Sequence, residues 1–288
     1  MTTQELISLQ SVTDIYYSYR ENWSIRGLNE FAKTIYCEDG EDGIIEKIFS
    51  IIGEESKYFV EFGAWDGCHL SNTYLLRKDK NWKGLLLDGK FDIPEINLHK
   101  HYLTAENIVE LFLKYNVPQK FDFLSVDIDG NDFYLLKSIL GSFKPRVIVV
   151  ETNQLISPLI AATIEYNPNI YFDVNARYFG ASTKAFDNLT KLHGYQLVCQ
   201  HDQNAFFVLN EDAEKLAIHF KFIGNVEKIF KPRIPRHWTD STGKHFLFTK
   251  ACIEELSVNN TYPNGLEPLI EYSMKNLDLG GDWVINPK

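Results

Sequence analysis

One stretch of the chain decides the fold: Tyr58-Phe59-Val60-Glu61-Phe62-Gly63-Ala64-Trp65-Asp66-Gly67. It begins as a β-branched and aromatic strand and ends in a turn that contains two glycines. Gly63 and Gly67 lack a Cβ, so the chain can bend sharply there and approach a ligand closely. The next apolar run ends in Asp88, where a carboxylate can accept hydrogen bonds from both hydroxyls of a ribose. The stretch therefore predicts a nucleoside-binding turn.

An alternation of strands and helices continues from this stretch. Strand-like apolar runs occur at 57–62, 84–88, 101–104, 121–127 and 146–151, with helical segments at 69–80, 106–116 and 131–141. Such an alternation is typical of a parallel sheet covered on both faces. Two later runs, 195–199 and 204–209, are too close for a helical crossover and predict an antiparallel pair. The expected fold class is α/β, a Rossmann-like doubly wound sheet that ends in an antiparallel hairpin.

The composition is that of a globular protein, with 288 residues, 44% hydrophobic and 24% charged. A formal net charge of −10 argues against a general nucleic-acid binder, which needs a basic surface to displace counterions from phosphates. The cysteines form no CxxC pair and no zinc-ligand spacing. Reduced thiols in a cytosolic protein are the simplest interpretation.

The N-terminus lacks the basic and apolar regions of a signal peptide, and no apolar run approaches the ~20 residues that span a bilayer. We therefore expect a soluble, cytoplasmic protein with no membrane span. Residues 1–35 are expected to form a helical extension and residues 36–210 the core. Residues 211–288 form a C-terminal extension with acceptor binding as its candidate role. No feature of the sequence indicates a particular oligomeric state.

Polar groups follow every predicted strand of the main sheet. In an open α/β sheet the ligand lies beyond the carboxyl ends of the strands, where the strand order reverses. The groups at those ends are Glu61 to Gly67, Asp88, Thr104-Ala105-Glu106-Asn107, Asp127-Ile128-Asp129-Gly130-Asn131-Asp132 and Glu151-Thr152-Asn153.

The first of these turns differs from a dinucleotide site. Such a site would place GxGxxG after the first strand, with a pyrophosphate at the following helix. This chain reads Gly63-Ala64-Trp65-Asp66-Gly67 instead, and its carboxylates Glu61 and Asp66 would repel a diphosphate. The pattern favours a ligand with positive charge and no phosphate. S-adenosylmethionine (SAM), with its sulfonium, ammonium and ribose, meets that description.

Several blocks of the sequence follow one another in a defined order over residues 36–209: Cys37 to Ile44, Phe59 to Gly67, Leu70 to Tyr74, Trp82 to Asp88, Phe123 to Asp132, Tyr178 to Ala185 and Asn204 to Val208. Together they resemble the FkbM-like family of class I SAM-dependent methyltransferases. The resemblance implies that Glu61, Gly63 and Asp66 surround the methionine part of SAM, with Ala64, Trp65 and Gly67 in the same turn. It also implies that Asp88 holds the ribose, that Thr104, Ala105 and Glu106 flank the adenine, and that Asp127 and Asp129 face the reacting methyl. The connection Lys90 to Ile96 is shorter than the family pattern, which weakens the adenine assignment.

Transfer of a methyl group to a hydroxyl requires alignment and removal of the hydroxyl proton. A metal that lowers the pKa of the hydroxyl is one solution. Asp127, Asp129, Glu151 and Asn153 supply hard oxygen ligands at two neighbouring strand ends, which suit Mg²⁺ or Mn²⁺. The alternative is that the Asp129–Asp132 segment only turns the chain and caps a helix, while Asp127 orients SAM.

Other candidates for catalysis and acceptor binding lie outside the strand ends. His69 and His201 are alternative bases, although each also fits an ordinary surface or helix-end histidine. Tyr178 can stack on a sugar or base, or serve packing. The segment Lys228 to His245 is basic, and its Arg233 and Arg236 are candidates for gripping a phosphate-bearing acceptor. A solvated basic loop is the alternative.

The leading hypothesis is a SAM-dependent O-methyltransferase that acts on a hydroxyl of a sugar, a sugar-nucleotide, a surface-glycan precursor or a secondary metabolite. A nicotinamide-dependent oxidoreductase is one alternative, and the missing GxGxxG speaks against it. A non-catalytic SAM-fold binding protein is another. Carboxylates at three strand ends, Glu61, Asp88 and Asp127, favour the enzyme over a scaffold.

Overall fold

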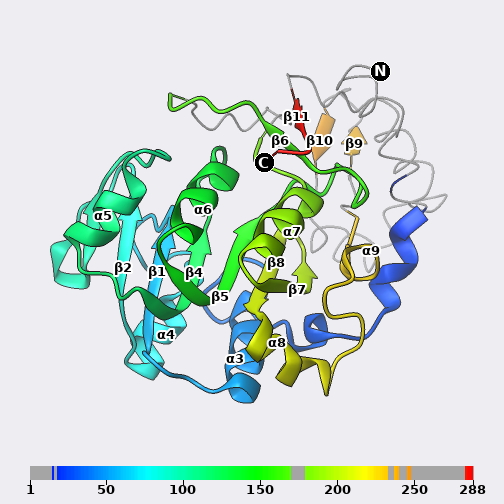
Figure 1. The fold of residues 1–288 in the computed structure, drawn as a ribbon, viewed down its shortest axis with the longest axis horizontal. Coiled ribbons are helices and arrows are strands. Elements are labelled where there is room, and N and C mark those ends of the chain that lie inside the picture. Colours follow the sequence, from blue (N-terminus) through cyan, green and yellow to red (C-terminus); the bar gives the residue numbers. More distant parts are fainter. Residues whose placement is uncertain are drawn as a thin grey trace.

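A mixed sheet forms the centre of the fold (Figure 1). The computed structural model describes residues 15, 18–169, 179–232, 237–239, 245–247 and 283–287. Within this part of the chain the main sheet has seven strands in the order β3-β2-β1-β4-β5-β8-β7. They are β1 (Tyr58–Phe62), β2 (Lys83–Asp88), β3 (Leu98–Lys100), β4 (Lys120–Val126), β5 (Lys144–Glu151), β7 (Tyr195–His201) and β8 (Asn204–Leu209).

The strand directions divide the sheet into a parallel part and an antiparallel edge. β1 pairs in parallel with both β2 and β4, and β5 continues the parallel part beside β4. β8 then runs antiparallel to β5, and β7 runs antiparallel to β8. The carboxyl ends of β1, β2, β4 and β5 therefore lie at one edge of the sheet, the upper edge in Figure 1.

Helices cover both faces of the sheet because successive strand residues point to opposite sides. Along β2, Leu85 and Leu87 belong to one buried cluster and Leu86 to the other. The first cluster receives the apolar sides of α5 (Ile108–Lys114), α6 (Asp132–Leu140) and α7 (Thr183–Leu192), which Figure 1 shows in front of the sheet. The second receives α3 (Glu41–Ile52), α4 (Tyr74–Lys80) and α8 (Asn210–Ala217). The predicted Rossmann-like doubly wound sheet with its antiparallel hairpin is confirmed.

The third strand lies earlier in the chain than predicted. The sequence indicated residues 101–104, whereas β3 is Leu98–Lys100 and follows a 3₁₀ turn at Pro94–Ile96. Only Leu98 of this strand is fully buried, so it has no apolar run to mark it. Its place is fixed by the pairing of Leu86 with Leu98 and by Asn97, whose amide donates to the Gly84 carbonyl at 2.7 Å.

The described parts of both chain ends pack against the core. The N-terminal segment holds 3₁₀ helices at Arg20–Ser24 and Leu28–Phe31, and α9 (Val226–Ile229) lies beside it. The buried Asn22 amide donates to the carbonyls of Glu227 and Phe230, at 2.6 and 2.9 Å, and Lys231 Nζ donates to the Asn22 carbonyl. These contacts form a clasp between residue 22 and residues 227–231.

Two small sheets lie outside the main one. β6 (Ala162–Ile164) pairs with β11 (Trp283–Ile285), and β9 (His237–Thr239) pairs with β10 (His245–Leu247). Among the helices that the structure describes, none has the length and apolar character needed to cross a bilayer.

A buried ion cluster joins four elements at the amino ends of β4 and β5. The Arg146 guanidinium, 1% exposed, contacts Asp122 and Asp212 at 2.9 Å each. It also donates to the carbonyls of Ile52 and Gly53 at the end of α3. Because the cation and both carboxylates are buried, Arg146 and Asp122 compensate each other's charge, and Arg146 shares Asp212 with Lys215, which lies 2.7 Å away.

Candidate functional site

The site forms where the strand order reverses, between β1 and β4. Gly63 ends β1 with φ of 63°, in the left-handed region. A Cβ placed on Gly63 would lie 1.9 Å from the carbonyl oxygen of Asp127, at the end of β4. The turn after β1 therefore lies directly against the end of β4, and only glycine permits this contact.

Glu61 shapes the loop behind this turn. Its carboxylate is buried and accepts hydrogen bonds from the Ser71 hydroxyl, the Asn72 backbone N–H and the Thr73 hydroxyl, at 2.7, 2.8 and 2.5 Å. Burial raises the pKa of Glu61, and these hydrogen bonds act in the opposite direction. Since residues 71–73 are held in this way, α4 begins only at Tyr74 and not near residue 69 as predicted.

Asp88 ties the loops after β1 and β2 together. One carboxylate oxygen accepts from the Trp65 backbone N–H at 2.9 Å, and the other accepts from the N–H groups of Lys90 and Phe91 at 2.6 and 3.1 Å. Trp65 is 54% exposed, with its ring centroid 6.3 Å from that of Phe91. The carboxylate predicted to hold a ribose thus lies between two loops and beside two aromatic rings.

Asp66 closes the turn that carries His69. Its carboxylate accepts from the backbone N–H groups of His69 and Cys68 at 2.7 and 2.9 Å, and these bonds hold the pKa of Asp66 below its usual range. The exposed His69 ring lies 6.0 Å from that of Trp65. His69 is therefore on the Trp65 side of the site.

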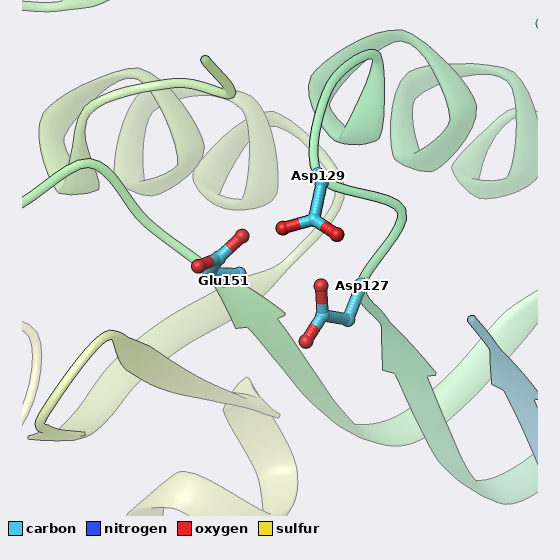
Figure 2. Close-up of side chains that lie close together, drawn as sticks. All are labelled: Asp127, Asp129 and Glu151. Carbon is cyan, nitrogen blue, oxygen red and sulfur yellow. The ribbon is translucent and has the colours of Figure 1, made fainter. Parts of the chain in front are cut away.

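Three carboxylates converge at the ends of β4 and β5. Asp127, Asp129 and Glu151 each offer an oxygen, and these oxygens lie within 4.8 Å of one another. Figure 2 shows the three side chains pointing toward one common space. Asn153, the fourth predicted ligand, follows Glu151 by two residues, and its side chain accepts from the Leu155 N–H and donates to the Phe179 carbonyl.

Burial and the repulsion of neighbouring carboxylates make Asp127 and Asp129 resist ionisation. Burial, followed by the charges of Asp132, Asp129 and Glu38, raises the pKa of Asp127 well above its ordinary value. Burial and the negative charges of Asp132 and Glu38 raise the pKa of Asp129 to about 6. Asp129 also has φ of 56°, uncommon for a residue with a side chain. A positive charge placed here would relieve this repulsion.

Surrounding loops hold the cluster in place. Asp132 accepts from the backbone N–H groups of Ile128 and Gly130 at 2.8 Å each, which fixes the bend that carries Asp129. Gln203, in the β7–β8 turn, donates to Glu151 at 2.9 Å. Asp132 thus turns the chain, as considered for the Asp129–Asp132 segment, but no side chain caps the start of α6. Asp129 points toward Asp127 and Glu151.

The second predicted base, His201, contacts the loop before α3. Its Nε2 lies 2.7 Å from the Asp39 carbonyl, and the buried Glu41 carboxylate accepts from the Asn204 amide at 2.8 Å. These contacts dock the loop on the β7–β8 turn and bring Glu38 near the acidic cluster.

The segment predicted to flank the adenine is also in contact with a distant loop. Thr104 and Asn107 bond reciprocally through side chain and backbone, at 2.9 and 3.3 Å. Between them, Ala105 N–H and the Glu106 carboxylate both contact the hydroxyl of Tyr166. Tyr178, Arg233 and Arg236, the predicted acceptor-binding residues, lie outside the described residues.

Sequence reasoning did not assign Glu38 and Tyr166 to the site. Glu38 belongs to the acidic stretch Glu38 to Gly43, whose acids favour the positive end of a helix. The carboxylates Glu41 and Asp42 do lie in the first turn of α3, and Glu38 is the member that faces the site. Tyr166 lies in a segment with no motif, so its sequence held no signal.

The strand order identifies the fold. Its central β1 and β4, its parallel β2, β3 and β5, and its antiparallel β8 and β7 follow a Rossmann-like pattern. This strand order is consistent with the class I methyltransferase fold.

Comparison with known proteins adds little to this result. No protein-family model matches the sequence, and no curated protein matches it. The solved CurJ carbon methyltransferase is 13% identical, with 58% of this chain and 52% of that chain covered and a TM-score of 0.34. The citrinin polyketide synthase CMeT domain is 10% identical, with 70% and 60% covered and a TM-score of 0.31. The chain therefore spans little more than half the length of either, and at these scores neither supports an argument about activity.

Proposed function

We propose that the protein is a SAM-dependent methyltransferase that transfers a methyl group to a hydroxyl. The convergence of Asp127, Asp129 and Glu151 at the ends of β4 and β5, beside the point where the strand order reverses, carries this proposal. A ligand with positive charge is stabilised by such a cluster, whereas a diphosphate is repelled. When bound, SAM supplies a methyl group on a cationic sulfur.

The residues present fit the parts of SAM. A carboxylate has about four acceptor positions, and Asp88 uses three for backbone N–H groups, which leaves about one for a ribose hydroxyl. The bare backbone at Gly63 lets the turn after β1 lie directly against Asp127, which brings this turn beside the acidic cluster. Glu61 acts on this site indirectly, by positioning the loop at residues 71–73.

Asp129 is the residue best suited to accept the proton of the acceptor. Its pKa of about 6 leaves it mostly ionised at neutral pH, yet basic enough to share a proton with a hydroxyl. Asp127, whose pKa rises more strongly, faces the same space. The acceptor class we propose is a sugar, sugar-nucleotide, surface-glycan precursor or secondary metabolite, which rests on the FkbM-like blocks of the sequence.

The same carboxylates fit a divalent cation. Three oxygens from Asp127, Asp129 and Glu151 are hard ligands of the kind that Mg²⁺ and Mn²⁺ prefer, and they leave room for water or an acceptor oxygen. A bound cation would lower the pKa of the acceptor hydroxyl. Treatment with EDTA should then abolish turnover and Mg²⁺ or Mn²⁺ should restore it, whereas full activity in excess EDTA would remove the metal from the proposal.

Calorimetry tests the cofactor directly. The protein should bind S-adenosylhomocysteine, the product form of SAM, and should not bind NAD. Binding of NAD alone would overturn the proposal. Incubation with methyl-labelled SAM and a panel of sugars and sugar-nucleotides, read by mass spectrometry, then identifies the acceptor through the mass of one added methyl group.

A further inference from the structure

A single hydroxyl bridges the two polar groups of the loop before α5. The Tyr166 oxygen accepts from the Ala105 backbone N–H at 3.2 Å, and its O–H donates to Glu106 Oε2 at 2.5 Å. The second bond is the main reason why the pKa of the Glu106 carboxyl lies below its usual value. Two adjacent residues thus present one donor and one anionic acceptor, and Tyr166 satisfies both.

Tyr166 belongs to the segment that follows β6 and passes over α6 to this loop. We call residues 164–169 the strap. Its start is held by the Tyr134 hydroxyl, which donates to the Ile164 carbonyl at 2.9 Å, and the rings of Tyr134 and Tyr166 lie 4.9 Å apart. The Asn131 amide, 2% exposed, donates to the Asn167 carbonyl at 2.7 Å. Figure 1 shows the chain leaving β6 and running above α6 toward the side of α5.

The pair of groups under Tyr166 matches one edge of an adenine. Adenine offers a ring nitrogen as an acceptor beside an exocyclic amino group as a donor. The Ala105 N–H suits the ring nitrogen, and the Glu106 carboxylate suits the amino group. The Tyr166 hydroxyl makes the same two bonds, so the tyrosine and an adenine cannot use the pair together.

We propose that Tyr166 is a latch on the adenine subsite. In the free protein its hydroxyl occupies the Ala105–Glu106 pair, and an adenine nucleoside must displace it, together with the strap, in order to bind. This inference rests on the proposed use of SAM. The apparent affinity for the nucleoside is reduced by the fraction of molecules in which the latch is open.

The variant Tyr166→Phe tests the latch because it removes the hydroxyl and keeps the ring beside Tyr134. Calorimetry should show that Tyr166→Phe binds S-adenosylhomocysteine about five to ten times more tightly than the unaltered protein, the gain expected when one or two competing hydrogen bonds are lost. Tyr58→Phe, at the amino end of β1, is the matched control and should bind with unchanged affinity. Equal melting temperatures for the three proteins show that each is folded.

A second ligand tests whether the Ala105–Glu106 pair recognises this edge of the adenine. S-inosylhomocysteine carries a ring N–H and a carbonyl oxygen where adenine has an acceptor and an amino donor. It should bind at least about tenfold more weakly, because the Ala105 N–H would then face another donor and the Glu106 carboxylate another acceptor. Equal binding of the two nucleosides would overturn the assignment of the Ala105–Glu106 pair.

Hydrogen exchange supplies a readout that does not depend on affinity. Addition of S-adenosylhomocysteine should speed amide exchange in the strap, the reverse of the protection that a ligand normally confers. Slower exchange there, or equal or weaker binding by Tyr166→Phe, would overturn the latch while leaving SAM binding intact. If neither protein bound the nucleoside, the proposed function and the latch would fail together.

Discussion

Replacement of Gly63 by alanine isolates the contact on which the site depends. An alanine at φ of 63° costs about 1–2 kcal/mol, because its Cβ approaches the following carbonyl. In addition, the Cβ would lie 1.9 Å from the Asp127 carbonyl oxygen, so the turn and the end of β4 must separate by about 1 Å. Forced separations of this kind cost about 1–3 kcal/mol. We expect Gly63→Ala to lower the free energy of unfolding by about 2–5 kcal/mol in total.

Two other glycines provide the controls. Gly53 has φ of 79° and ψ of 158° but no atom within 4 Å of the position that a Cβ would occupy, so Gly53→Ala should show only the conformational cost of about 1–3 kcal/mol. Gly89 has no atom within 4 Å of its Cβ position and does not have a positive φ, so Gly89→Ala should change the free energy of unfolding by no more than about 0.5 kcal/mol. Denaturation in urea at one pH, with equal slopes required for all proteins, measures the series.

The contact also predicts a loss of function that the controls do not share. In buffer where all the variants are folded, Gly63→Ala should bind S-adenosylhomocysteine at least about tenfold more weakly, since the turn is displaced from Asp127. Gly53→Ala should bind normally. If Gly63→Ala cost no more stability than Gly53→Ala, the close approach of the two strand ends would be refuted.

Three further predictions concern charged groups. Arg146→Ala should lower the free energy of unfolding by about 3–5 kcal/mol, because it leaves Asp122 buried without its cation and Asp212 with only the half-exposed Lys215; urea denaturation measures it. The folded state raises the pKa of Asp129 from 3.8 to about 6, so protonation of Asp129 favours the folded state. The stabilisation that this protonation gives is complete below pH 3.8 and is lost as the pH rises to 6. In EDTA, the unaltered protein should therefore gain about 1 kcal/mol relative to Asp129→Asn between pH 7 and pH 5, and an identical pH profile for the two would contradict this assignment. Asp88→Ala should weaken S-adenosylhomocysteine binding at least about tenfold while the circular dichroism stays unchanged, and unaltered affinity would remove Asp88 from the site.

The sheet was predictable because its strands are buried on both faces and so appear as continuous apolar runs. β4 and β5 are of this kind, and the sequence placed them within two residues of their observed bounds. β3 was misplaced because a three-residue strand with one buried side chain carries no periodic signal. Register with Leu86, a tertiary contact, decides where it lies.

The acidic cluster was predictable for a related reason. Asp127 and Glu151 end neighbouring parallel strands, so the fold alone brings them together. Tyr166 reaches Glu106 across 60 residues of sequence, and Glu38 arrives on a loop docked on the hairpin. Such contacts depend on how loops settle on the finished core, which local patterns do not encode.

The clasp between Asn22 and residues 227–231 has a consequence for biosynthesis. Asn22 is bonded to carbonyl groups 205 and 208 positions later in the chain. At about 5–20 residues per second, a ribosome needs about 10–40 s to make that intervening length. Throughout this interval the earliest described part of the protein waits without its partners, exposed to chaperones and proteases, and it settles only after the sheet has been completed.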